Sequence, residues 1–295
     1  MSFSCGSSAS YGVVVRDELY VDATRPTPAN GSFGGSPSRA IEVKFFVPAV
    51  HGKISRRGAP YPTILFSHGS SATPYTYERL LDAFVRAGFL VVAPVYPLST
   101  TLAPGGFTPT DVDQQPGDAS FVLDQVLAAN RDPKSWLHGL VNPKRIGTAG
   151  HSLGGMTTYG LVYNACCRDA RIKAAAVLSG ATVVLPGETR TFPANSFFTG
   201  IHTPLLAVHG DQDPIVPYSA GRDAWNAANA PKFFLTRLGG NHIGDETGGS
   251  AVGQELVTHA LIDFFRRYLN RSPDALGDLK HDGNRSGVAT LVADP

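Results

Sequence analysis

The chain has 295 residues, of which 42% are hydrophobic and only 17% are charged, and its formal net charge is +1. A chain of this length can bury a large core, and its low charge content excludes an intrinsically disordered protein or a long coiled coil. The near-neutral charge argues against overall attraction to nucleic acid, and no apolar run approaches the ~20 residues of a membrane span.

The ends of the chain are predicted to be loosely structured. Residues 1–10 are rich in Ser and indicate a flexible N-terminus, and residues 271–295 are rich in Gly, Asp and Asn and indicate a coil-like C-terminal tail. A Pro-, Gly- and Ser-rich stretch at residues 22–40 predicts a long loop. We therefore interpret residues 1–295 as a single domain whose core lies between these ends.

Between the ends, short apolar runs alternate with helical patterns. Strands are predicted at residues 13–15, 41–47, 63–66, 89–93, 145–149, 172–178, 205–208 and 233–238, and helices at residues 77–87, 119–129, 154–165, 220–228 and 254–269. Asp118 is the predicted N-cap of the second helix. The pattern predicts an α/β fold with about eight strands, mostly parallel, and helices on both faces of the sheet. In such sheets the functional groups lie at the carboxyl ends of the strands.

A candidate nucleophile lies between one predicted strand and the next predicted helix. The sequence Gly150-His151-Ser152-Leu153-Gly154 matches G-x-S-x-G, a motif that needs a strand before it and a helix after it. The turn strains the backbone at the serine, so its neighbours two residues away must be small. Ser152 is therefore the predicted nucleophile, and its hydroxyl needs a base.

Two later strands end in groups that can complete a triad. The strand at residues 205–208 is followed by two acids, Asp211 and Asp213, and the strand at 233–238 is followed by His242 in a Gly-rich loop. The chain order of nucleophile, acid and histidine fits this type of fold. His242 is the predicted base, whereas the spacing alone leaves both acids open.

These motifs resemble those of the α/β-hydrolase superfamily over nearly the full chain. The resemblance rests on Phe66-Ser67-His68-Gly69, on residues 150–155, on His209 to Pro217 and on Gly240-Asn241-His242. Within the superfamily the chain resembles bacterial predicted dienelactone-hydrolase and platelet-activating-factor-acetylhydrolase-like esterases, and it is similar in layout to cutinase-like polyester hydrolases. The resemblance implies an α/β-hydrolase fold and selects Asp213 as the triad acid, with Asp211 shaping the turn.

The resemblance also implies an oxyanion hole formed by the backbone N–H groups of Leu153 and Ser70. Only about 25 residues, 180–203, separate two predicted strands at the usual place of a cap, so no large lid and a fairly open site are expected. Aromatic residues in nearby loops are candidate pocket walls; they are Tyr75, Tyr96, Phe107 and Phe198, with Tyr77, Phe192 and Phe197 as further candidates.

The predicted activity is carboxylic-ester hydrolysis through an acyl-enzyme on Ser152, acting on small acyl esters or polyesters. Lipid-ester hydrolysis is the main alternative, and a peptidase, an amidase or a non-catalytic binding protein are weaker ones. The mechanism requires no cofactor and no metal. We expect a monomer with no nucleic-acid partner. No signal peptide is visible in this chain, although the resemblance to polyester hydrolases favours an extracellular or cell-envelope location.

The three cysteines do not form a disulfide scaffold, and no Cys/His spacing matches a zinc site. Cys166 and Cys167 are adjacent and follow an apolar helical run. We interpret them as two thiols at a helix end, with a disulfide between them or a bridge to Cys5 as the alternatives.

Overall fold

The computed structural model of the chain describes residues 11–182, 196–244 and 251–295. The predicted flexible N-terminus, residues 1–10, lies outside the described residues. So do residues 183–195, which include Phe192 and most of the segment on which the expected absence of a lid rests.

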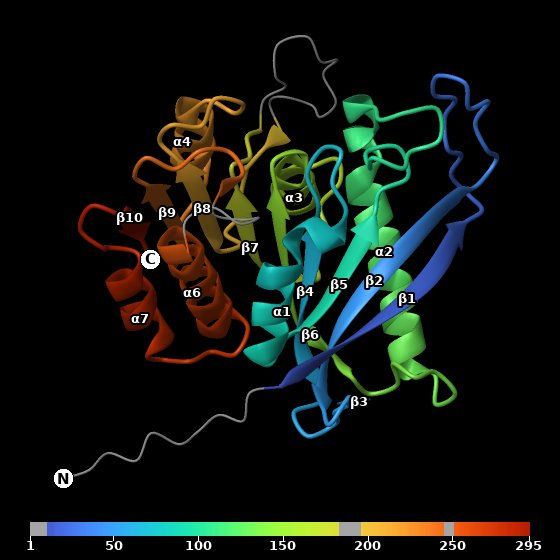
Figure 1. Cartoon of the computed structure of the whole chain (residues 1–295), viewed down its shortest axis with the longest axis horizontal. Coiled ribbons are helices and arrows are strands. Elements are labelled where there is room, and N and C mark those ends of the chain that lie inside the picture. The colour runs from blue at the N-terminus through green and yellow to red at the C-terminus, as the bar shows by residue number, and fades with distance from the viewer. Residues whose placement is uncertain (1–10, 183–195, 245–250) are drawn as a thin grey trace.

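Ten strands of the described residues form one mixed sheet in the order β1-β2-β5-β4-β6-β7-β8-β9-β10, and β3 pairs with β2 (Figure 1). Their bounds are β1 (Gly12–Asp22), β2 (Arg39–Val50), β3 (Lys53–Ile54), β4 (Tyr61–Ser67), β5 (Leu90–Val95), β6 (Val141–His151), β7 (Ile172–Leu178), β8 (Leu205–Gly210), β9 (Lys232–Arg237) and β10 (Ala289–Asp294). The pairings from β5 to β9 are parallel, whereas β1, β2, β3 and β10 pair antiparallel. The predicted fold class is confirmed, with more strands than the eight expected.

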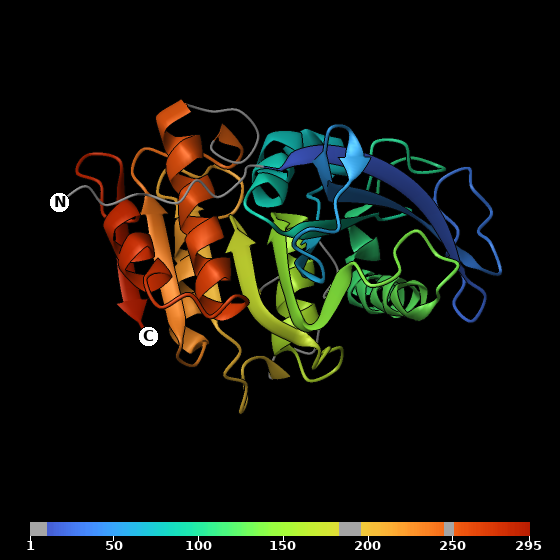
Figure 2. The same ribbon diagram turned by 90° about the horizontal axis from the view of Figure 1, so that it is seen from below.

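Six α-helices of the described residues cover the two faces of the sheet (Figure 2). They are α1 (Glu78–Arg86), α2 (Gln115–Arg131), α3 (Leu153–Tyr163), α4 (Tyr218–Ala227), α6 (Ala251–Tyr268) and α7 (Ala275–Asp282). Apolar side chains of α2, α3 and α4 pack on one face, and those of α1, α6 and α7 pack on the other. Two short 3-10 helices, Pro74–Tyr77 and Pro109–Asp113, lie in loops at the carboxyl ends of β4 and β5.

The burial of each strand follows its place in the sheet. All seven residues of β4 are buried, as expected for a central parallel strand with helices on both sides. Exposed residues alternate with buried or partly buried ones along β10, as expected for an edge strand with one face in solvent. The continuous apolar runs of the sequence therefore correspond to the central strands, and the candidate site residues follow the carboxyl ends of such strands.

The prediction of a coil-like tail at residues 271–295 is wrong. This segment contains the helix α7 and the strand β10, and β10 pairs antiparallel with β9. The segment is mostly polar, but Leu279 and Ala289 are buried in the same core cluster as the apolar residues of α6 and attach it to the domain. Packing against β9 and α6 outweighs the weak local propensity of the segment.

The interpretation of Cys166 and Cys167 as two thiols is also wrong. The structure joins them by a disulfide. The helix α3 ends at Tyr163, and the side chain of Asn164 accepts the backbone N–H of Cys166 at 3.0 Å. The pair therefore lies in a turn beyond the helix end, and neither cysteine extends α3.

A buried ion-pair cluster ties the start of β2 to the loop and helix beside the site. The guanidinium of Arg39 is fully buried and lies 2.6 Å from carboxylate oxygens of both Asp111 and Asp118. Asp118 lies inside the first turn of α2, which begins at Gln115, so its predicted role as N-cap is wrong. Burial raises the pKa of Asp111, and the hydrogen bond and charge of Arg39 offset part of this rise.

Replacing Arg39 by methionine is expected to lower the free energy of unfolding by ~3–5 kcal/mol, because Asp111 would remain buried without its cation and Asp118 would keep only the partly exposed Arg25, 2.9 Å away. Urea denaturation of the folded protein measures this loss. The control is Arg86→Met, since Arg86 is 55% exposed and lies 3.7 Å from Asp82, and such pairs contribute at most ~1 kcal/mol. Equal losses in the two variants would contradict the structural role given to Arg39.

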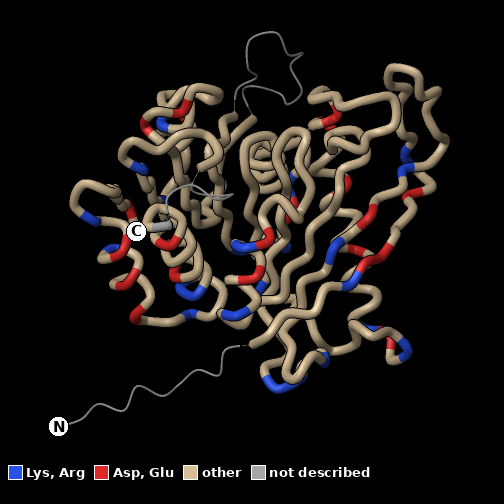
Figure 3. Tube along the Cα trace, in the orientation of Figure 1, with Lys and Arg blue, Asp and Glu red and all other residues tan. Residues whose placement is uncertain are grey.

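Charges of the two signs are interspersed along the described part of the chain (Figure 3). This distribution agrees with the formal net charge of +1. Among the helices that the structure describes, none combines the length and the apolar character needed to cross a bilayer.

Candidate active site

The residues predicted to form a triad come from loops at one edge of the sheet. Ser152 follows β6, Asp213 lies in the loop after β8, and His242 lies in the loop after β9. Because β6 to β9 are parallel neighbours, their carboxyl ends lie along the same edge (Figure 1). Residues up to 90 positions apart in the chain are brought together by this topology.

The three side chains form one continuous hydrogen-bonded chain. Ser152 Oγ lies 2.9 Å from His242 Nε2, and His242 Nδ1 lies 2.7 Å from Asp213 Oδ2. Both distances lie in the range for a nucleophile that hands its proton to an oriented base. The arrangement can therefore activate the serine hydroxyl for attack on a carbonyl group.

The backbone at Ser152 is strained in the way that the motif predicts. Its φ is 54° and its ψ is −118°, values that residues other than glycine rarely adopt. Glycine is required two residues away on each side. A Cβ on Gly150 would lie 2.1 Å from the carbonyl oxygen of Gly154, and a Cβ on Gly154 would lie 2.0 Å from that of Ser67. The sharp turn thus presents Ser152 between β6 and α3.

Asp213 is held as a carboxylate by four hydrogen-bond donors. Its Oδ1 accepts the backbone N–H groups of Ile215 and Val216 at 2.8 and 2.9 Å, while Oδ2 faces His242 and His209. Burial by itself raises the pKa of Asp213, but these hydrogen bonds outweigh burial and hold the pKa well below its usual range. Asp211 instead accepts the N–H of Gly239 at 2.7 Å, which shapes the turn.

In the loop after β4, the N–H groups on both sides of Ser70 are engaged in hydrogen bonds. The N–H of Gly69 is donated to Tyr77 Oη, that of Ser71 to the carbonyl of Ser99, and that of Ala72 to the carbonyl of Gly69. Within the described residues, the N–H of Ser70 and that of Leu153, at the start of α3, have no acceptor. These are the two groups predicted for the oxyanion hole, and Ser70 lines the same pocket as Ser152.

His68 stabilises this loop through two hydrogen bonds to the backbone. Its Nδ1 lies 2.9 Å from the carbonyl oxygen of Gly69, and its Nε2 lies 3.0 Å from the backbone N of Tyr96. Burial lowers the pKa of His68 to about 4, so the ring is neutral at neutral pH. It donates through Nδ1 and accepts through Nε2, and these two hydrogen bonds fix the loop at Gly69 against Tyr96.

The pocket above Ser152 has a volume of about 410 Å³ and an apolar rim. Phe107, Ile215 and Ile243 line it and are 39%, 52% and 49% exposed. Ile215 and Ile243 were missed by sequence reasoning, although each lies within two residues of a predicted triad member and could have been found by that adjacency.

The predicted pocket walls are only partly placed at this pocket. Phe107 and the further candidate Tyr77 line it, whereas Tyr75 lines a neighbouring groove. The prediction is wrong for Tyr96, which is fully buried with its hydroxyl 2.7 Å from Ser67 Oγ. It is also wrong for Phe198, which is buried against Tyr159 and Tyr163. Both side chains are part of the packed interior and do not reach the pocket.

No group of three or more His, Cys, Asp or Glu side chains within the described ranges is arranged to hold a metal ion. The described histidines at the site are instead engaged with backbone carbonyls or with Asp213.

Comparisons with known proteins agree with this architecture. Residues 42–186 match the family model described as chlorophyllase. No curated protein matches the chain. Among many matching solved structures, a ferulic acid esterase from Streptomyces cinnamoneus has a TM-score of 0.68 at 20% identity and covers 91% of this chain and 93% of its own. The chain therefore has the α/β-hydrolase fold, as the motifs predicted, while the narrower resemblances remain predictions.

Proposed function

We propose that this chain is a serine carboxylic-ester hydrolase that works through an acyl-enzyme on Ser152. The observation that carries the proposal is the hydrogen-bonded chain from Ser152 through His242 to Asp213 at the floor of a pocket. The match to the chlorophyllase family model and the likeness to a ferulic acid esterase support an ester as the substrate.

In the proposed mechanism His242 Nε2 takes the proton of Ser152 as Oγ attacks the ester carbonyl carbon. The tetrahedral intermediate then collapses, and the alcohol leaves with the proton that His242 returns to it. A water molecule, deprotonated by His242, attacks the acyl-enzyme and releases the acid and free Ser152. Asp213 keeps the imidazole in the tautomer that accepts at Nε2 and stabilises the imidazolium.

The negative oxygen of the intermediate needs donors that are already in place. We assign this role to the N–H groups of Leu153 and Ser70, because neither has another acceptor in the described residues. Donors that are already held in position stabilise the oxyanion more than water does, and each is typically worth ~10²–10³ in turnover.

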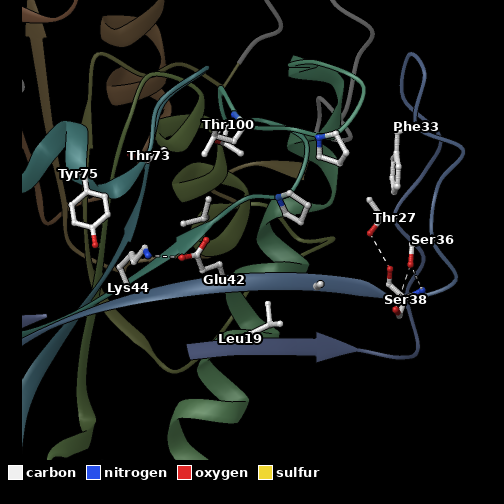
Figure 4. Close-up of a pocket in the computed structure, with 15 residues that line it drawn as sticks. Leu19, Thr27, Phe33, Ser36, Ser38, Glu42, Lys44, Thr73, Tyr75 and Thr100 are labelled. Carbon is white, nitrogen blue, oxygen red and sulfur yellow. Dashed lines mark hydrogen bonds and ion pairs between the residues drawn. The ribbon is translucent and has the colours of Figure 1, made fainter. Parts of the chain in front are cut away.

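A groove of about 450 Å³ lies beside the site pocket and favours an extended substrate. Figure 4 shows Tyr75 and Phe33 on opposite sides of it, with the Lys44–Glu42 ion pair and Leu19 between them. Thr73 and Tyr75 line the groove, while the adjacent Ala72 and Thr76 line the pocket. Residues 72–76 border both, and we infer that an ester longer than the pocket reaches the groove across this stretch.

The finer proposal is therefore an ester with an apolar part long enough to reach this groove, as in a polyester, rather than a small acyl ester alone. The exposed apolar rim formed by Phe107, Ile215 and Ile243 also suits a lipid ester, which is the second candidate. Initial rates on p-nitrophenyl esters from acetate to palmitate test the general activity. A short-chain optimum favours small or polymeric esters, and a long-chain optimum favours lipid esters. A folded protein that hydrolyses none of them would contradict the proposal.

Leu102 gives a test of the groove, because it lines the groove and is 84% exposed. Leu102→Asp is expected to lower kcat/KM about tenfold on long-chain or oligomeric esters. Covering about half of a leucine is worth roughly 1.4 kcal/mol. The rate on the acetate ester should stay within about twofold. Val292→Asp, at a half-exposed position on β10, is the matched control. Equal rates for both variants on every ester would contradict a role of the groove.

A further inference from the structure

Two buried residues, Tyr77 and His151, line the pocket beside Ser152 and take no part in the proposed triad. Tyr77 ends the 3-10 helix after the oxyanion loop, and His151 is the last residue of β6, directly before Ser152. They are 2% and 4% exposed. The sequence indicated only a candidate pocket wall for Tyr77, and the structure brings Tyr77 and His151 into contact across 74 positions of the chain.

The two side chains form a hydrogen-bonded chain with the backbone on each side. The N–H of Gly69 is donated to Tyr77 Oη at 3.0 Å, and Tyr77 Oη lies 2.8 Å from His151 Nδ1. At the other end His151 Nε2 lies 2.8 Å from the carbonyl oxygen of His242. The chain thus runs without a break from the oxyanion loop to the backbone of the proposed base.

The direction of every hydrogen bond in this chain is determined. The carbonyl oxygen of His242 can only accept, so His151 Nε2 must carry a hydrogen. Burial, and then the neighbouring His242, lower the pKa of His151 to about 4, so at neutral pH its Nδ1 is an acceptor. Tyr77 consequently donates its hydroxyl hydrogen to Nδ1 and accepts the N–H of Gly69. None of these groups can reverse its role without losing a buried hydrogen bond.

The packing leaves little freedom to shift these contacts. A Cβ on Gly69 would lie 2.9 Å from Tyr77 Oη and 3.1 Å from His151 Nδ1, so only glycine lets the loop approach so closely. The ring of His151 packs against that of His242 with 4.9 Å between centroids, and the ring of Tyr77 packs on Phe66.

We propose that Tyr77 and His151 are positioning residues that couple the oxyanion donor at Ser70 to the base His242 through this single hydrogen-bonded chain. The inference rests on the proposed function, because it assigns its two ends the roles of oxyanion donor and base. A displacement of about 1 Å at either end costs on the order of 10² in rate. Breaking the chain should therefore impair the chemical step and leave substrate binding nearly unchanged.

The test is Tyr77→Phe, which keeps the ring and removes only the hydroxyl. Its kcat is expected to fall about 10–100-fold while KM stays within about twofold. The matched control is Tyr96→Phe, since Tyr96 is similarly buried and its hydroxyl is hydrogen-bonded to Ser67 Oγ, away from the pocket. The control is expected to keep kcat within about threefold at a similar loss of thermal stability.

A second variant separates positioning from folding. The second variant is His151→Leu. The kcat of the double variant, which combines it with Tyr77→Phe, should lie no more than about threefold below that of the less active single variant, because the chain acts as one unit. Losses that multiply would contradict a continuous chain. So would a kcat for Tyr77→Phe equal to that of Tyr96→Phe, which would assign Tyr77 to packing alone.

A fluorophosphonate probe keeps this test independent of the ester chosen. Labelling forms the Ser152 Oγ–P bond, expels fluoride and needs the same base and the same oxyanion donors. Slower labelling of Tyr77→Phe than of Tyr96→Phe is expected, and equal rates would overturn the coupling. Normal labelling of the parent protein together with unimpaired ester hydrolysis by Ser152→Ala would instead overturn the proposed function.

Discussion

Replacing Ser152 by alanine is expected to lower kcat for ester hydrolysis by on the order of 10⁶-fold, because the variant has no oxygen to form the acyl-enzyme. The base His242 and the free N–H groups of Leu153 and Ser70 would remain. They leave only the residual acceleration of ~10³–10⁴ over water that binding and the oxyanion hole supply. Initial rates on p-nitrophenyl acetate measure the loss, together with a melting curve to establish that the variant is folded.

Ser179→Ala is the matched control for this experiment. Ser179 is also buried at the carboxyl end of a neighbouring strand, and its Oγ has no hydrogen-bond partner among the described residues. Removing that oxygen should change kcat by less than about threefold. If Ser152→Ala kept a tenth of the parent rate, the hydrolysis would proceed elsewhere in the molecule and the proposed mechanism would be wrong.

The second large effect is expected for Asp213→Asn, with a loss of ~10⁴-fold in kcat. The amide can keep its oxygen on the N–H groups of Ile215 and Val216, and its NH₂ group then faces His242 Nδ1. His242 must accept there and carry its hydrogen on Nε2, which turns a hydrogen toward Ser152. The side chain keeps its place, yet the imidazole can no longer take the serine proton.

Asp211→Asn separates the two acids that the sequence left open. Its side-chain oxygen can still accept the N–H of Gly239, so activity should stay within about threefold. A pH profile adds a second check. Because the pKa of Asp213 lies well below its usual range, its ionisation should not limit the rate above about pH 4. A large loss in Asp211→Asn and a small one in Asp213→Asn would reverse the assignment.

Much of the site was predictable because its residues follow strands that are themselves evident from the sequence. Ser152 comes after one apolar run, and Asp213 and His242 follow two others. Parallel neighbours end at the same edge, so these three side chains had to lie near one another. The choice of Asp213 over Asp211 needed the family resemblance. Both acids follow the same strand within a few residues, so the position of the strand end does not distinguish them.

The pocket walls were harder to predict, since the side a loop residue faces depends on what lies beneath it. Tyr96 and Phe198 carry the same kind of side chain as Phe107, yet they fill the core while Phe107 lines the pocket. The C-terminal tail gave a similar difficulty. Its composition is typical of a coil, but part of it pairs as β10 with the edge of β9, and Leu279 packs in the core cluster that contains α6.

The sequence by itself determined the fold class, the strained serine turn and the identity of the groups that end the central strands, because these depend on local periodicity and on glycine spacing. Only the tertiary structure decided which N–H groups stay free, which aromatic side chains are buried, and that Tyr77 and His151 bridge the loop at Gly69 to His242. Such contacts join residues far apart in the chain. Their partners are selected by packing and by the need to satisfy buried polar groups, for which no local pattern exists.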